Sequence, residues 1–158
     1  MHLVGVRVEM PTNSPIVLLR EADGQHRVLP IFIGPVEATA IAFAQNGVAT
    51  ARPLTHDLLR DLLVALGVGV ERIVITELRD RTFYAEIEMT KNGSGYKVSS
   101  RPSDAIALAA RLGTPIFADE SVLEEAAVTM SEHDEEEEDE VERFREFLEG
   151  VNPEDFAS

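Results

Sequence analysis

The chain has 158 residues, and its 29 Asp and Glu against 14 Lys and Arg give a formal net charge of −15 at pH 7. The absence of cysteine excludes disulfide bonds, thiolate nucleophiles and sulfur-ligated metal centres, so any metal site must use oxygen or nitrogen ligands. No surplus of basic residues exists that would bind a phosphate backbone by counterion release alone, which disfavours strong non-specific binding to nucleic acid.

The negative charge is concentrated at the end of the chain. Residues 131–158 hold 13 acids and two arginines, a net charge of −11, which leaves −4 for residues 1–130. The block of like charge over 134–140 predicts disorder, and residues 141–148 have the pattern of a short helix that would dock on the domain or on a protein partner. We therefore expect one domain over 1–130 and an acidic, largely disordered tail over 131–158.

Three strands are predicted at the start of the chain. Apolar and polar residues alternate over 3–10, which is the period of a half-buried strand. Residues 16–20 and 27–33 are the next two strands, joined by a turn that contains Asp23-Gly24, a strong hairpin signal. Together they predict an antiparallel meander. Its first strand is expected to bury the face formed by Val4, Val6, Val8 and Met10.

Two helices are predicted to follow. Gly34-Pro35 ends the third strand and suits a helix start, and that helix runs to about Asn46-Gly47. The next helix begins at Thr55, whose hydroxyl can cap it, and ends at Gly67. We expect both helices to pack on the sheet. The second has an apolar stripe made of Leu58, Leu59, Leu62, Leu63 and Leu66.

The second half of the domain repeats this order of elements. Strands are predicted over 70–78, 82–90 and 96–100, helices over 102–112 and 119–128, and a short apolar segment over 115–118. The order is βββαα followed by βββα(β)α at a spacing of about 65 residues, which suggests an internal duplication of a βββαα unit. Segregated strands and helices indicate an α+β fold with antiparallel or mixed sheets.

No membrane segment is expected. The longest apolar run, Leu62 to Val70, is much shorter than the roughly 18 residues of a membrane span. The start of the chain lacks the basic region of a signal peptide. We therefore predict a cytoplasmic protein.

Polar side chains recur where the predicted helices begin. Both 52–57 and 101–104 place an arginine before a proline, then a hydroxyl, then a carboxylate in the first helical turn, and Glu37 lies in the first turn of a third helix. One interpretation is structural. Acidic residues in the first turn complement the helix dipole, the hydroxyls of Thr55 and Ser103 cap the helices, and the arginines pair with the carboxylates that they precede.

The other interpretation is catalytic. If Glu37, Asp57 and Asp104 converge at one end of the sheet, their hard oxygen ligands suit Mg²⁺ or Mn²⁺, which would activate water and stabilise phosphoryl oxygens. His56 would be the general base, because an unperturbed imidazole titrates near pH 6.5. Phosphate would be bound by guanidinium groups in forked geometry, with hydroxyls beside them. These substrate-binding residues are Arg52, Thr55, Arg101 and Ser103.

Four segments resemble the bifunctional nuclease family of bacteria and plants. They are LPIFIGPVEATAIA (29–42), RPLTHDLL (52–59), FYAEI (83–87) and SSRPSDAIALAARLGTPIFADESVL (99–123). The resemblance covers residues 1–130 with the motifs in family order. It implies a self-associating α+β domain, a homodimer or higher homo-oligomer, that acts on RNA and DNA. The family-like polar residues coincide with those at the predicted helix starts.

Two functions are therefore considered. The first is a nuclease that hydrolyses phosphodiester bonds in RNA or DNA with a divalent metal. The second is a non-enzymatic, self-associating regulatory domain in which the same residues cap helices and tie loops together. The first requires a local basic cleft in an acidic body. Residues that would supply this cleft if they cluster are Arg52, Arg79, Arg81, Lys91, Lys97 and Arg101.

Overall fold

The first sheet is built from the three strands that begin the chain. The computed structural model describes residues 1–129, and Met1–Val128 form one compact unit. Strands β1 (His2–Glu9), β2 (Ser14–Arg20) and β3 (Val28–Phe32) pair antiparallel in the order β1-β2-β3, as the meander prediction requires. The predicted acidic tail and its short helix lie outside the described residues.

Strand β1 contains a bulge that changes which side chains face the core. Leu3 pairs with Leu19 and Gly5 with Leu18, so Val4 is the extra residue between two ladder positions. Leu3 and Val6 consequently pack on the core, whereas Val4 and Val8 are exposed. The predicted buried face of Val4, Val6, Val8 and Met10 is therefore wrong except at Val6. The bulge takes Val4 out of the alternation, Val8 is exposed near the end of the strand, and Met10 lies beyond it.

The second sheet forms from the later half of the chain. Strands β4 (Gly69–Arg79), β5 (Thr82–Lys91) and β6 (Ser94–Ser100) are antiparallel, and β7 (Ile116–Ala118) adds to β4 in parallel. The strand order is β6-β5-β4-β7, so this sheet is mixed. Helix α3 (Pro102–Leu112) supplies the crossover between β6 and β7, and α4 (Glu120–Ala126) follows.

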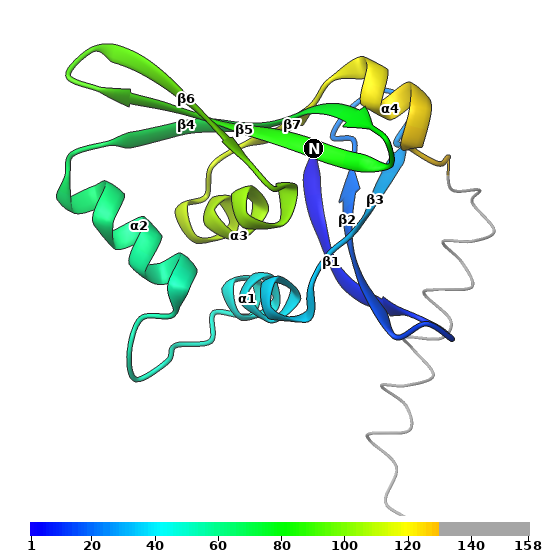
Figure 1. Cartoon of the computed structure of the whole chain (residues 1–158), viewed down its shortest axis with the longest axis horizontal. Helices are drawn as coiled ribbons and strands as arrows, with labels where there is room; N and C mark the ends of the chain where they lie inside the picture. The colour runs from blue at the N-terminus through cyan, green and yellow to red at the C-terminus, as the bar shows by residue number, and fades with distance from the viewer. Residues whose placement is uncertain (130–158) are drawn as a thin grey trace, which may run out of the picture. The chain divides into compact units, whose positions relative to one another are not determined.

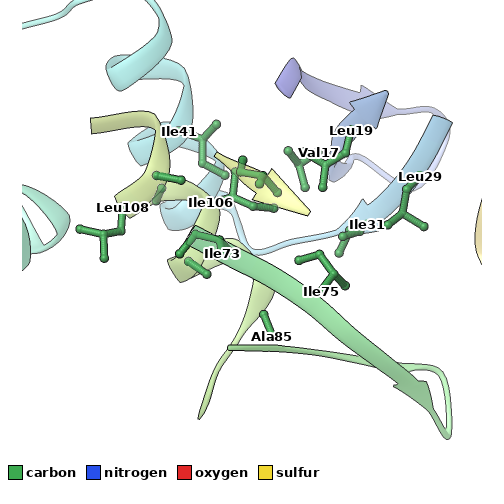
Figure 2. Packing of buried hydrophobic residues seen from close by; sticks show 14 of the residues in the cluster. Val17, Leu19, Leu29, Ile31, Ile41, Ile73, Ile75, Ala85, Ile106 and Leu108 are labelled. Atoms are coloured by element: carbon green, nitrogen blue, oxygen red, sulfur yellow. The ribbon is translucent and has the colours of Figure 1, made fainter. Parts of the chain in front are cut away.

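The helices α1 (Pro35–Gln45) and α3 join the two sheets through one core. α1 packs on β1 and β2, α3 packs on β4 and β5, and the two helices contact each other. Figure 1 shows α3 beneath the second sheet and α1 beneath α3. Figure 2 shows the apolar side chains of both sheets and both helices meeting. Fully buried members include Leu19, Leu29, Ile41, Ile73, Ile75, Ile106 and Leu108.

Helix α2 (Thr55–Ala65) lies differently from the prediction. Its main contact is with α3, whereas we expected it to pack on a sheet. Leu59 and Leu63 pack on the core, but Leu58 and Leu62 are about half exposed. The predicted stripe is therefore wider than the surface that α3 covers. The leucines left exposed form a row at spacings of four residues: Leu54, Leu58, Leu62 and Leu66.

The observed order is βββαα followed by βββαβα, which makes this an α+β fold with one antiparallel and one mixed sheet. The halves differ because the second inserts β7 between its helices. The internal duplication stays a prediction. Within residues 1–129, no helix is both long and apolar enough to cross a membrane.

The core position of α3 makes a measurable prediction. Leu108 is fully buried, so Leu108→Ala should lower the free energy of unfolding by about 2–5 kcal/mol through lost transfer energy and a residual cavity. Val36 on α1 is 72% exposed, and Val36→Ala should change it by less than about 0.5 kcal/mol. Urea unfolding of both variants measures the difference. Similar losses in the two variants would contradict this packing.

Candidate functional site

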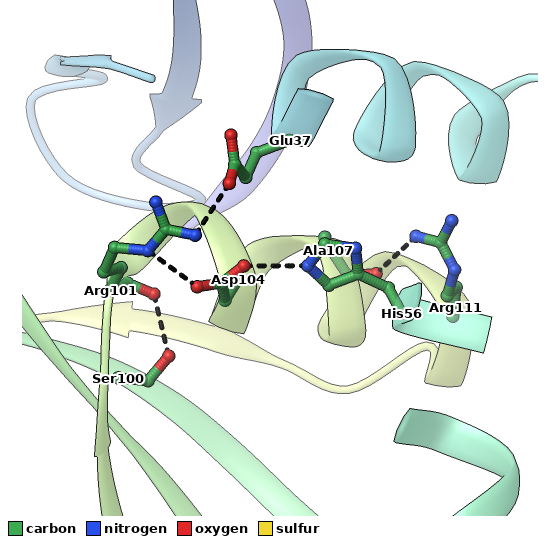
Figure 3. Close-up of polar contacts among 7 residues, drawn as sticks. All are labelled: Glu37, His56, Ser100, Arg101, Asp104, Ala107 and Arg111. Atoms are coloured by element: carbon green, nitrogen blue, oxygen red, sulfur yellow. Dashed lines mark hydrogen bonds and ion pairs between the residues drawn. The ribbon is translucent and has the colours of Figure 1, made fainter. Parts of the chain in front are cut away.

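Arg101 connects the starts of two helices. It is the N-cap residue of α3, where its guanidinium can reach back to the first turn. Its Nε donates a hydrogen bond to Asp104 Oδ2 at 2.8 Å, and its Nη2 donates one to Glu37 Oε1 at 2.7 Å. Figure 3 shows the guanidinium between the two carboxylates, one from α1 and one from α3. The arrangement fixes Arg101 from two sides.

A third helix joins this group through His56. The imidazole Nε2 lies 2.8 Å from Asp104 Oδ1, so Asp104 is held by Arg101 on one oxygen and His56 on the other. Only 8% of the His56 side chain is exposed, against 64% of Arg101. We call Glu37, His56, Arg101 and Asp104 the Arg101 network. It runs from a buried ring at α2 to an exposed guanidinium at α3.

The electrostatics of the network keep both carboxylates ionised. The hydrogen bond from Arg101 lowers the pKa of Glu37 below its ordinary value. Burial alone would raise the pKa of Asp104, but hydrogen bonds from His56 and Arg101 outweigh it and the net shift is downward. An ionised carboxylate only accepts hydrogen bonds, so His56 Nε2 must donate to Asp104. The same carboxylates raise the pKa of Arg101, which stays charged.

Gly34 explains how Glu37 reaches this position. It precedes α1, and a Cβ added there would collide with the Glu37 carboxylate. The carboxylate therefore folds back over the start of its own helix, where its own backbone N–H also donates to it. A side chain at position 34 would push Glu37 away from Arg101.

Asp57 is engaged elsewhere. Its Oδ2 accepts a hydrogen bond from the Leu54 backbone N–H at 2.9 Å, and its Oδ1 accepts one from Arg111 Nε at 2.7 Å. These two bonds lower the pKa of Asp57, the one from Arg111 having the larger effect. Arg111 comes from the last turn of α3, is only 4% exposed, and also donates to the Ala107 carbonyl. Asp57 thus caps α2 and ties it to α3.

The other predicted site residues lie around these groups without joining them. Leu54, rather than Thr55, is the N-cap of α2, and no side-chain hydroxyl caps it; the capping prediction for Thr55 is wrong. Arg101 takes the N-cap of α3, so the prediction for Ser103 is wrong as well. Arg52 is exposed, and its side chain makes no hydrogen bond or ion pair with residues 1–129.

Glu37, Asp57 and Asp104 already have cationic partners and are not arranged as ligands for a divalent ion. The structure brings Glu37 and Asp104 together, but both bind the Arg101 guanidinium, and Asp57 binds Arg111. Across residues 1–129, no three His, Asp or Glu side chains are grouped as metal ligands would be. The donor set as arranged does not fit Mg²⁺ or Mn²⁺, and metal use stays a prediction.

A cleft of about 640 Å³ opens beside the Arg101 network. Arg101 and Ser103 line it from the start of α3, Phe32 from the end of β3, and Arg81 from the turn between β4 and β5. Part of the predicted basic cleft is therefore present. Arg79 instead stacks on Tyr84, and Lys97 pairs with Glu88.

Two residues in this region carried weaker sequence signals. Arg111 was not predicted, although a basic residue in the last turn of a helix is the expected complement to its dipole. Arg81 appeared only as one basic residue among several, because its proximity to Arg101 depends on how β5 and β6 pair.

The Asp57 contact should be structural. Asp57→Ala removes the partner of a guanidinium that is 4% exposed, so we expect a loss of about 3–5 kcal/mol in unfolding free energy. Asp61→Ala in the same helix breaks an exposed pair with Arg60 and should cost less than about 1 kcal/mol. Chemical denaturation of both variants compares them. Equal costs would show that Arg111 does not depend on Asp57.

The lowered carboxylate pKa values predict an acid-dependent stability. Unfolded Glu and Asp titrate near 4.3 and 3.9, and folded Glu37, Asp57 and Asp104 titrate lower. Their contribution is therefore complete above those unfolded values and is lost as pH falls through the folded ones. Urea unfolding between about pH 5 and pH 3 should show a shallower decline for Glu37→Gln than for Glu125→Gln, an exposed control on α4. A steeper decline in Glu37→Gln would contradict the lowered pKa of Glu37.

Comparison with known proteins places this arrangement in a family. A relative from Mycobacterium tuberculosis strain H37Rv, an uncharacterized protein, is 49% identical over 164 residues, covering 100% of this chain and 98% of the relative. Bifunctional nuclease 2 of Oryza sativa subsp. japonica is 29% identical over 115 residues, 71% of this chain and 35% of the plant protein. Bifunctional nuclease 1 of Arabidopsis thaliana is 28% identical over 105 residues, 65% of this chain and 32% of the plant protein.

The plant alignments therefore span about a third of each plant protein, whereas the mycobacterial one is nearly end to end. The sequence model described as the bifunctional nuclease domain matches residues 17–131. This range contains the whole Arg101 network, the Asp57–Arg111 pair and most of the cleft, and it covers well over half of the chain. The chain belongs to the bifunctional nuclease domain family.

Proposed function

We propose that this domain hydrolyses phosphodiester bonds in RNA or DNA and that the Arg101 network is its reaction site. The supporting observation is an exposed arginine held between two ionised carboxylates beside an open cleft. Family membership supports the reaction class, because the plant relatives are named bifunctional nucleases. A cation can stabilise negative charge on the phosphate, and a carboxylate can accept the proton of the attacking water.

Arg101 would bind the phosphate. Its Nε and one N–H of Nη2 bind carboxylates, while Nη1 makes no hydrogen bond to residues 1–129 and the side chain is 64% exposed. A guanidinium presents paired donors that match two phosphoryl oxygens. Three of its five N–H donors are therefore open, two on Nη1 and one on Nη2, so a phosphate can bind before either carboxylate is displaced. The bound phosphate then competes with Glu37 for Nη2, and this contact between two helices is the one that we expect to weaken.

Glu37 would then accept the proton of the attacking water. In the resting structure Arg101 holds its pKa down, which leaves it ionised but weakly basic. When Arg101 turns to the phosphate, that effect is lost and the carboxylate becomes a stronger base close to the bound phosphate. Water oxygen bonds to phosphorus, its proton passes to Glu37, and the ester oxygen departs and is protonated from solvent.

Asp104 and His56 would hold Arg101 in place. Asp104 keeps one oxygen on Arg101 and the other on His56, and the His56 ring is enclosed. We assign His56 the orientation of Asp104 rather than contact with the substrate. Arg52 and Thr55 stay predicted substrate contacts. Mg²⁺ or Mn²⁺ stays a predicted cofactor, and no step above depends on one.

A second candidate function is a self-associating, non-enzymatic domain. It is favoured by the exposed row Leu54, Leu58, Leu62 and Leu66, an apolar helix face that α3 leaves uncovered. A second copy of α2 packed antiparallel would cover this row with the same row. In this function the Arg101 network serves only to join three helices.

A nuclease assay of the purified chain separates the two candidates. Labelled RNA and DNA would be incubated with Mg²⁺, Mn²⁺ or chelator, using the wild type, Arg101→Gln, Asp104→Asn and His56→Ala. Arg101→Gln should lower the rate by about 100-fold or more, as loss of a charge-stabilising donor does in other active sites. Arg72→Gln breaks an exposed pair with Glu88 and should leave the rate unchanged.

Thermal melting of each variant distinguishes lost chemistry from lost folding. Equal trace activity in the wild type and every folded variant would indicate a contaminating nuclease, and the non-enzymatic function would then be favoured. Cleavage that survives Arg101→Gln but disappears with chelator would assign the reaction to a metal instead.

A further inference from the structure

The cleft beside the Arg101 network has features that hydrolysis alone does not require. It has a volume of about 640 Å³ and lies where the ends of β2 and β3, the β4–β5 turn and the starts of α1 and α3 meet. This volume falls within the range of small-ligand sites. Its lining combines two cations, two aromatic rings and a hydroxyl. Arg101 and Ser103 come from the start of α3, and Phe32, Arg81 and Phe83 from β3, the β4–β5 turn and β5.

Arg81 is the second cation. It occupies the β4–β5 turn with φ +61°, next to Asp80 at φ +50°, so both turn residues adopt the left-handed conformation. Glycine or asparagine adopts this conformation at least cost in such turns, and an arginine there is strained. Arg81 lines the cleft and makes no hydrogen bond or ion pair with residues 1–129. The turn thus presents a cation without a protein partner.

Ser103 supplies a hydroxyl that opens to the cleft on the same side. It is 6% exposed, lines the cleft, and its hydroxyl has no hydrogen-bond partner among the described residues. It lies in the first turn of α3, whose N-terminus has no side-chain cap. A hydroxyl can donate to a phosphoryl oxygen, and helix N-termini favour anions. An anion bound between Arg81, Arg101 and Ser103 would satisfy all three groups.

The aromatic residues occupy another part of the lining. Phe32 is the last residue of β3 and is 61% exposed, while Phe83, near the start of β5, is half-buried. Because the Phe32 ring is already exposed, a flat ligand can stack on its face without displacing neighbouring side chains. Stacking of a base on such a ring is worth as much as a strong polar contact and does not depend on base identity.

We propose that this cleft binds one unstacked nucleotide of a single-stranded nucleic acid, with its phosphate at Arg81, Arg101 and Ser103 and its base against Phe32. The inference rests on the proposed function for the chemistry at Arg101 and adds the substrate class. Bases of a duplex are stacked on each other and unavailable to a protein ring, whereas those of a single strand are free. The domain therefore selects single strands over duplexes.

Binding can be tested without catalysis. A fluorescein-labelled phosphorothioate thymidine 8-mer, which resists hydrolysis, would be titrated with the full chain at low salt by fluorescence anisotropy. A duplex of the same oligonucleotide with its complement and an abasic 8-mer form the other arms. The single strand should bind at least tenfold more tightly than either. Inorganic phosphate at millimolar concentration should compete if the anion contact contributes.

Two variants with matched controls locate the site. Phe32→Ala and Arg81→Gly should each weaken binding about tenfold or more. Phe117→Ala removes a 47% exposed ring on β7, and Arg72→Gln removes a half-exposed cation on β4 outside the cleft; both should stay within about twofold of wild type. Arg81→Gly should keep or raise the melting temperature, because glycine relieves the left-handed strain.

The outcomes separate this inference from the proposed function. Equal binding of single strand and duplex, or equal loss in the control variants, would overturn the nucleotide cleft. Abasic binding as tight as the thymidine 8-mer would indicate a phosphate site without base recognition and would also overturn it. If single strands bind through Phe32 and Arg81 but are not cleaved, the nucleotide-binding cleft would be supported and the proposed nuclease function would be rejected. If the wild type cleaves nucleic acid and neither variant changes the rate, the nuclease function would be supported and the nucleotide-binding cleft would be rejected.

Discussion

The sharing of one guanidinium by two carboxylates determines how the helices of this domain meet. Arg101 binds Glu37 and Asp104, and Asp104 in turn binds His56. The apolar core sets the distance between α1 and α3, but apolar contacts are not directional. The hydrogen bonds specify which ends of the helices lie together. Because Arg101 is 64% exposed, the same bonds bring a cation to the surface that solutes can reach.

Two polar contacts attach α2 to α3. At one end of α3, Asp104 binds His56 beside the cleft; at the other, Arg111 binds Asp57 away from the Arg101 network. Neighbouring residues of α2 therefore fasten it to both ends of α3. The exposed row of Leu54, Leu58, Leu62 and Leu66 lies away from α3 and contributes little to this attachment.

Local patterns predicted the elements well. Helix α3 begins and ends at the predicted residues, because Pro102 sets the start and the left-handed Gly113 sets the end. The bulge at Val4 was missed, since an extra residue is a property of the pairing rather than of one strand. The predicted contact of α2 with a sheet failed because a leucine-rich face does not specify which neighbour covers it.

The candidate site was predicted in composition more than in geometry. Arg101 and Asp104 are three residues apart at a helix start, so their pairing follows from local structure. Their contact with Glu37, and the separation of Asp57 from both, depend on how the helices pack.

The pairing of Glu37 with Arg101 spans 64 residues of chain, and that of His56 with Asp104 spans 48. The first βββαα half supplies Glu37 and His56, and the second half supplies Arg101 and Asp104. Neither half on its own therefore carries the proposed reaction site: the first lacks Arg101 and Asp104, and the second lacks Glu37 and His56. The four side chains come together only where the two halves pack. A fragment that keeps one sheet intact would therefore still lose the Arg101 network.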